Sequence, residues 1–243
     1  MAVTLFLLGC IFVLAHTTET VLGFGATLIA LALAVHILPL ETLVPILVIL
    51  GLLQSIWLVA RWFRYIEWRT LLLQILPIAG AGTVIGILSR EMANEGTLKI
   101  ILGAFIIVVS LSELAILFIS RIPSERLHWY YRIPLLVGGG IFHGLFATGG
   151  PPIVYYASRQ FHKQEKFRAT LSMLWLILNI GLLAGFLMAG QLDVHKLKIT
   201  AVVLPGLIIG IIIGTLIRVR KFWFKALTYI LLFFAGLLLL IQL

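Results

Sequence analysis

The sequence predicts an all-α integral membrane protein of two inverted-topology repeats, each a Gly-broken short-helix pair followed by three transmembrane helices. Three observations predict this fold: the composition, the spacing of two glycine-rich interruptions, and the distribution of Lys and Arg. The chain has 243 residues, of which 62% are hydrophobic and only 11% charged. A soluble domain carries about 25% charged residues, so the chain belongs in a membrane.

Ten apolar runs, separated by charged and turn residues, follow one another along the chain. They cover residues 2–16, 21–38, 42–60, 70–89, 97–120, 133–147, 151–158, 167–189, 197–217 and 223–243. Six of these runs approach or reach the roughly 20 residues that a helical crossing needs. The first, second, sixth and seventh runs are shorter, and we expect each pair of them to form one broken helix pair.

Each short pair flanks a glycine-rich interruption: Gly23-Phe24-Gly25 in the first half and Gly149-Gly150-Pro151-Pro152 in the second. Glycine loses more backbone freedom in a helix than other residues, and proline lacks the N–H of an interior turn. An exposed backbone group in hydrocarbon costs several kcal/mol unless protein or water satisfies it. We therefore interpret the two interruptions as the two sides of one binding site. The sequence leaves open whether the broken pairs are re-entrant or span fully.

The basic residues predict the orientation of the chain. If each broken pair returns to the side that it left, four clusters holding fourteen of the 18 Lys and Arg lie on one face. The clusters are Arg61, Arg64 and Arg69; Arg121, Arg126 and Arg132; Arg159, Lys163, Lys166 and Arg168; and Arg218, Arg220, Lys221 and Lys225. The positive-inside rule makes that face cytoplasmic. The prediction is a multi-pass protein of the cell (inner) membrane with both termini external.

The same topology divides the chain into an N-terminal repeat over residues 1–120, a cytoplasmic linker over 121–132 and a C-terminal repeat over 133–243. Pro77, Gly82 and Gly86 of the first half match Pro205, Gly210 and Gly214 of the second. We interpret these glycines, with Gly80, mainly as packing notches between helices. Inverted repeats with interrupted helices are typical of secondary transporters, whose site lies near the midplane.

The interruptions predict a site for a small anion. The first N–H groups of the helices that start near Ala26 and Ile153 lack intrahelical partners, and a helix N-terminus is the positive end of its dipole. The predicted substrate-binding residues are Gly23, Phe24, Gly25, Thr27, Gln54, Thr148, Gly149, Gly150, Pro151, Tyr155 and Asn179. For Gln54 and Asn179, contact between helices is an equally good interpretation.

Three ionisable residues within apolar sequence are candidates for proton coupling: Glu19, His143 and His16. Burying a charge in a membrane costs at least about 2.5 kcal/mol, so such groups are functional candidates. For each of the three, the alternative interpretation is an interfacial or hydrogen-bonded polar residue without a role in transport, and His16 is the weakest candidate. Glu113, with Ser110 and Ser112 nearby, is either part of a buried polar cluster or a helix-end group.

Other functional classes fit less well. The net charge of +9 follows from the topology clusters, so no nucleic-acid partner is predicted. The sequence has no zinc-protease, P-loop or Gly-x-Ser-x-Gly motif and a single cysteine, Cys10, which predicts no enzyme, cofactor or metal site. The expected partners are the lipid bilayer and a small anionic substrate, and a homo-oligomer stays open. An intramembrane enzyme acting on a lipid phosphate is the last alternative, because no Arg lies inside an apolar run.

Three motifs resemble the sulfite exporter TauE/SafE family over nearly the whole chain. They are Glu19 to Gly25, Gly144 to Pro152 with Tyr155, and Gly190 to Asp193 before the helix with Pro205 and Gly214. The chain departs from the family pattern where Ala26-Thr27 follows Gly25. The resemblance implies two weakly related halves and secondary transport of sulfite, thiosulfate or organosulfonates. The resulting hypothesis is a proton-coupled exporter of a small sulfur-containing anion, with an uncoupled anion channel on the same scaffold as the alternative.

Overall fold

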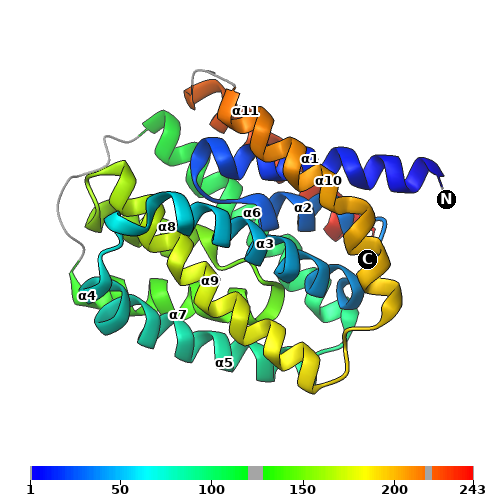
Figure 1. The fold of residues 1–243 in the computed structure, drawn as a ribbon, viewed down its shortest axis with the longest axis horizontal. Helices are drawn as coiled ribbons and strands as arrows, with labels where there is room; N and C mark the ends of the chain where they lie inside the picture. The colour runs from blue at the N-terminus through cyan, green and yellow to red at the C-terminus, as the bar shows by residue number, and fades with distance from the viewer. Residues whose placement is uncertain (1, 120–127, 217–220, 243) are drawn as a thin grey trace. The chain divides into compact units, whose positions relative to one another are not determined.

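A computed structural model describes residues 2–119, 128–216 and 221–242, and these residues form helices and turns without a strand (Figure 1). The prediction of an all-α protein is confirmed. The helices are α1 (Ala2–Leu22), α2 (Ala26–Ala34), α3 (Leu40–Trp62), α4 (Trp68–Thr70), α5 (Leu76–Met92), α6 (Glu95–Ile119), α7 (Trp129–Phe146), α8 (Gly150–Gln160), α9 (Gln164–Met188), α10 (Val194–Leu216) and α11 (Lys221–Ile241).

Seven stretches of the described chain are long and apolar enough to cross a membrane. Six of them correspond to the six long apolar runs, but the seventh, Thr4–Leu22, contradicts the prediction of a short first helix over 2–16. The helix accommodates the polar residues after Leu14 because hydroxyls of the threonines find acceptors within it. The hydroxyls of Thr18 and Thr20 donate to the carbonyl oxygens of Leu14 and His16, each at 2.8 Å.

The helices that follow the two interruptions are short. At a rise of about 1.5 Å per residue, the nine residues of α2 and the eleven of α8 extend only about 13 Å and 16 Å. Neither helix reaches across a hydrocarbon core of about 30 Å. In each half of the chain, a longer helix and one of these short helices precede three long helices.

The chain forms two compact units, and each contains helices from both halves of the sequence. One unit comprises residues 1–43, 93–123 and 202–243; the other comprises 44–92 and 124–201. Of the expected cytoplasmic linker, residues 121–127 lie outside the described residues, as do the basic residues Arg121, Arg126, Arg218 and Arg220.

In the second unit, α5 lies along α7, the helix that leads to the second interruption (Figure 1). Glycines line this contact. A methyl group on Gly82 would overlap the carbonyl oxygen of Val137, and one on Gly86 would overlap that of Ile141. The packing interpretation is therefore confirmed for these two glycines. It is wrong for Gly80, where an added methyl group would find nothing within 4 Å.

In the first unit, α10 makes a comparable contact with α1, the helix that leads to the first interruption. A methyl group on Gly210 would lie 2.9 Å from the carbonyl oxygen of Val13, and one on Gly214 the same distance from that of Thr17. Packing is confirmed for these glycines too. Val13 and Thr17 precede Val137 and Ile141 by 124 residues, so the same type of contact recurs at a fixed offset along the interrupted helices.

These contacts predict that Gly86→Ala destabilises the protein while Gly80→Ala does not. Overpacking a tight contact costs about 1–3 kcal/mol, and the backbone of α7 blocks the new methyl group at residue 86. We expect Gly86→Ala to lower the melting temperature of the purified protein in detergent. Gly80 lies on the same helix in open space, so Gly80→Ala is the matched control. Equal melting temperatures for the two variants would contradict the tight contact.

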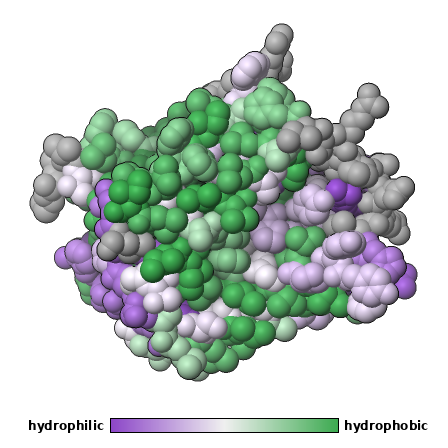
Figure 2. Space-filling model, turned by 180° about the vertical axis from the view of Figure 1, so that it is seen from behind, coloured by the Kyte–Doolittle hydropathy of each residue, from purple (hydrophilic) through white to green (hydrophobic). Residues whose placement is uncertain are grey.

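Apolar side chains cover much of the protein surface that Figure 2 displays, as lipid contact requires. Inside the first unit, Glu113 of α6 forms an ion pair with Lys225 of α11, with 2.7 Å between the carboxylate and the ammonium group. Tyr229 also forms a hydrogen bond with Glu113. Glu113 thus belongs to a buried polar cluster rather than to a helix end.

Candidate anion-binding site

The first interruption is a short left-handed segment between α1 and α2. Helix α1 ends at Leu22, and α2 begins at Ala26 as predicted. Gly23 and Gly25 have φ angles of 91° and 104°, a region that glycine enters without steric cost. The two glycines therefore allow the chain to reverse within three residues.

A carboxylate of the chain itself occupies the start of α2. The backbone N–H of Ala26 donates to Oε2 of Glu19 at 3.0 Å, and Glu19 is only 8% exposed. The first N–H group of α2 that bonds within the helix is that of Ile29, which donates to the carbonyl oxygen of Gly25. The three preceding N–H groups therefore face the end of the helix, where the dipole favours negative charge. Glu19 shows that an oxyanion fits there.

The charge of Glu19 has few partners in its unit. Neither α1 nor α2 contains Lys or Arg, and residues 202–216 of α10 contain no titratable side chain. His16 lies one turn before Glu19 on α1. Helices α6 and α11 pack against each other and against α2. Their polar residues Glu113, Lys225 and Tyr229 contact one another. The Glu19 carboxylate is thus bound by the start of α2, through the N–H of Ala26.

His16 has a packing role in this unit. Its ring stacks on Phe12 with 6.1 Å between the centroids, and its Cβ lies 2.8 Å from where a methyl group on Gly210 would be. The side chain is therefore held where α1 meets α10. Its assignment to proton coupling stays a prediction.

The second interruption joins α7 to α8. Helix α7 ends at Phe146, and Ala147 follows with a φ of 55°, the one left-handed residue other than glycine in the described ranges. Ala147 and Gly149 lie 124 residues after Gly23 and Gly25. At both interruptions a left-handed residue ends the first helix, and a glycine precedes the second helix. No local sequence signal predicts this role for Ala147, because alanine is not a residue that favours a left-handed conformation.

Helix α8 begins at Gly150, so the prediction of a start near Ile153 is wrong. Pro151 and Pro152 lie in its first turn, where proline is tolerated because the missing N–H would lack an intrahelical acceptor anyway. The two prolines remove donors that an anion could use. The start of α8 therefore offers fewer backbone N–H groups than the start of α2, and Thr148, which is buried, is the hydroxyl nearest to it in sequence.

His143 lies beside the second interruption. It is 2% exposed, and its Cβ lies 2.9 Å from where a methyl group on Gly149 would be. The ring stacks on Trp175 of α9 with 5.4 Å between the centroids. Neither ring nitrogen has a hydrogen-bond partner within residues 2–119, 128–216 and 221–242. A buried imidazole of this kind can bind a polar ligand or exchange a proton.

The other predicted residues of this unit lie farther along its helices. Asn179 packs against Gly51 of α3, with Nδ2 3.2 Å from where a methyl group on that glycine would be. Gln54, one turn later on α3, is fully buried. This placement favours contact between helices for Asn179, although its Oδ1 has no partner among the described residues. Tyr155 lies five residues after Gly150 and accepts a hydrogen bond from Arg159.

The structure thus places Glu19, Gly23, Gly25 and Thr27 at the first interruption, and His143, Thr148, Gly149 and Gly150 at the second. The two groups belong to different compact units. A single site built from both stays a prediction. Within the described ranges, no group of three or more His, Cys, Asp or Glu side chains could hold a metal ion.

Comparison with known proteins gives two matches. The family profile described as "Sulfite exporter TauE/SafE" matches residues 7–239. A Cupriavidus necator protein named "Probable sulfite/organosulfonate exporter TauE" is 25% identical over 201 residues, which cover 81% of this chain and 77% of that protein. No solved structure matches the chain.

Proposed function

Because the chain belongs to the sulfite exporter TauE/SafE family, we propose that it is a secondary transporter that exports a small sulfur-containing anion from the cytoplasm. Sulfite and organosulfonates are the proposed substrates, in line with the name of the Cupriavidus necator relative. The proposal places the protein in the cell (inner) membrane with external termini. The clustering of fourteen of its 18 basic residues in four inter-helix segments supports this orientation.

The proposed architecture is an inverted repeat of residues 1–120 and 133–243, joined by a cytoplasmic linker over 121–132. The recurrence of the glycine contacts and of the two interruptions at an offset of 124 residues supports it. Transporters of this construction bind their substrate where interrupted helices meet. In this proposal the start of α2, with Thr27 as a hydroxyl donor, and the start of α8, with Thr148, each bind the substrate anion.

The observation that carries the mechanism is the hydrogen bond from the Ala26 N–H to the Glu19 carboxylate. In the ionised form, this carboxylate occupies the position at the start of α2 that a substrate anion requires. Two negative charges at one helix end repel each other. An arriving anion therefore displaces the carboxylate, which takes up a proton because α1 and α2 provide no cation to stabilise its charge. Anion binding and proton uptake are thereby coupled, so the anion and the proton cross in the same direction, and export is driven by a high cytoplasmic concentration of the anion.

Flux measurements test this function. In proteoliposomes containing the full chain, we expect a pH gradient to drive accumulation of sulfite or an organosulfonate on the less acidic side, against its concentration gradient. Protein-free liposomes provide the background. Flux that runs only down the anion gradient and ignores a pH gradient would contradict coupling and indicate an anion channel. Failure to move either substrate would contradict transport of these anions.

A further inference from the structure

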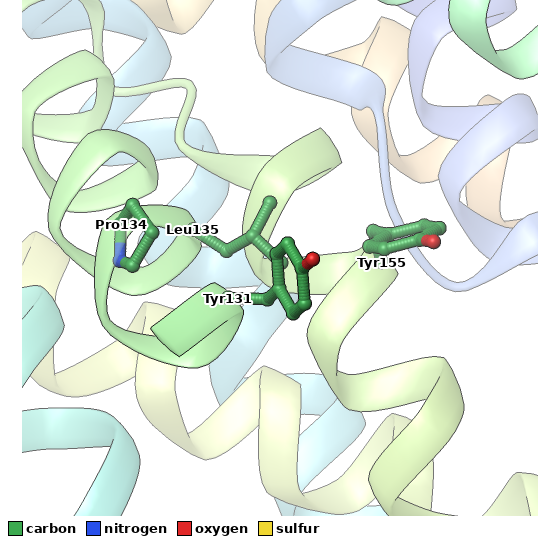
Figure 3. Close-up of a pocket in the computed structure, with 4 residues that line it drawn as sticks. All are labelled: Tyr131, Pro134, Leu135 and Tyr155. Atoms are coloured by element: carbon green, nitrogen blue, oxygen red, sulfur yellow. The ribbon is translucent and has the colours of Figure 1, made fainter. Parts of the chain in front are cut away.

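A cavity of about 510 Å³ lies between the beginning of α7 and the middle of α8 (Figure 3). Tyr131, Pro134 and Leu135 line it from α7, and Tyr155 lines it from α8. The three α7 residues share a helix face because they are spaced by three and four. The volume is in the range of small-molecule sites, roughly 300–1,000 Å³, and the lining is mostly apolar, with two phenol groups.

Two arginines lie close to residues that line this cavity. Arg159 donates from Nη2 to the hydroxyl of Tyr155 at 2.6 Å, and its guanidinium lies 4.9 Å from the centre of the Tyr155 ring. Arg132 follows Tyr131 and donates from Nη1 to Oε1 of Gln74 at 3.2 Å. A guanidinium has several rigid donors suited to oxyanions such as a sulfonate.

The charge of Arg132 is not neutralised within the described part of the chain. Its hydrogen-bond partner is the neutral amide of Gln74, and its buried Nε has no partner there. Gln74 also accepts a hydrogen bond from Tyr156 of α8 at 3.4 Å. It lies in a π-helical turn over Leu71–Ile75, a distortion that is frequent at functional sites. This turn thus joins Arg132 of α7 to Tyr156 of α8 through Gln74.

We infer that the cavity is a specificity-determining subsite for an anion that carries an apolar group, an alkanesulfonate rather than an inorganic oxyanion. The alkyl chain lies against Tyr131, Pro134 and Leu135, and the sulfonate takes the anion position at the start of α8. The positive charges of Arg132 and Arg159 near these residues favour an anionic ligand. Tyr155 follows Gly150 by five residues, or about 7.5 Å along α8. The inference rests on the proposed transport function, and it gives the organic part of the substrate a place separate from the two interruptions.

Equilibrium binding tests the subsite without relying on flux. The full chain in zwitterionic nanodiscs is titrated calorimetrically with sulfite and with alkanesulfonates of one to four carbons. Burial of one methylene is worth about 0.8 kcal/mol, so affinity should rise about threefold to fourfold with each carbon. Leu135→Trp, which fills the cavity, should remove this dependence and leave sulfite affinity within about twofold. If the Trp variant does not fold, Leu135→Ala provides the test, and it should weaken the dependence of affinity on chain length.

Ile133→Trp is the matched control, because Ile133 lies two residues from Leu135 on another face of α7 and does not line the cavity. We expect it to keep the chain-length dependence. Equal affinity across the series in the wild type, or equal weakening of sulfite and butanesulfonate by Leu135→Trp, would overturn the inference. Equal affinity for all the alkanesulfonates, together with weaker binding when anionic lipid is added, would assign the cavity to a lipid headgroup and would also overturn the inference. Chain-length-dependent binding without flux would contradict the transport proposal and leave the subsite supported.

Discussion

Glu19→Gln is expected to make anion binding independent of pH. In the wild type, an anion that displaces the ionised carboxylate causes uptake of one proton, so affinity should rise as pH falls, by up to about tenfold per pH unit. The rise should stop at low pH, where Glu19 is already protonated before the anion binds. Glutamine cannot ionise, and its side-chain oxygen can still accept the Ala26 N–H bond. The variant should therefore bind well at all pH values and lose accumulation driven by a pH gradient.

The measurement is the dissociation constant of an alkanesulfonate between pH 5 and 8, because this ligand remains a monoanion over that range. Glu113→Gln is the matched control, since it removes the other buried carboxylate of the same unit. Loss of the partner of Lys225 should lower the stability of this control, but its pH dependence should match the wild type. An unchanged pH dependence in Glu19→Gln would rule out the coupling role of Glu19.

The interruptions could be predicted because glycine and proline restrict a helix locally. Gly23, Gly25 and Gly149 stand out in apolar sequence, and Ala26 is where α2 begins. The order of helices follows from the same apolar runs. The end of α1 at Leu22 does not follow from the apolar runs, because the residues after Ala15 are polar. The helix accommodates Thr18 and Thr20 through hydroxyls that bond back to the preceding turn.

The partner of Glu19 could not be predicted from helical periodicity. On an unbroken helix Glu19 would meet residues three or four positions away, whereas the structure pairs it with Ala26, seven positions away across the reversal. At the second interruption, the predicted helix start near Ile153 is wrong because proline fits the first turn of a helix, and α8 begins at Gly150. The donors of the two helix starts consequently differ.

The two glycines of the second interruption are expected to respond differently to substitution. A methyl group on Gly149 would overlap the carbonyl oxygen of Gly139, whereas one on Gly150 would find nothing within 4 Å. Gly149→Ala should therefore lower stability by about 1–3 kcal/mol. Gly150→Leu should preserve the fold, because leucine is a better helix former than glycine by up to about 1 kcal/mol. Replacing both residues at once would mix a folding defect with a functional one.

Gly150→Leu is expected to reduce substrate flux in proteoliposomes more than tenfold while the melting temperature in detergent stays at or above that of the wild type. The added side chain occupies the space beside the first residue of α8, where the proposed anion binds, and moves water and ligand away from the helix start. Gly181→Leu is the matched control, since Gly181 of α9 is an exposed helical glycine whose added methyl group would also find nothing within 4 Å. We expect this control to keep wild-type flux. Wild-type flux in a folded Gly150→Leu protein would remove the start of α8 from the transport path and leave the start of α2, with Glu19, as the anion site.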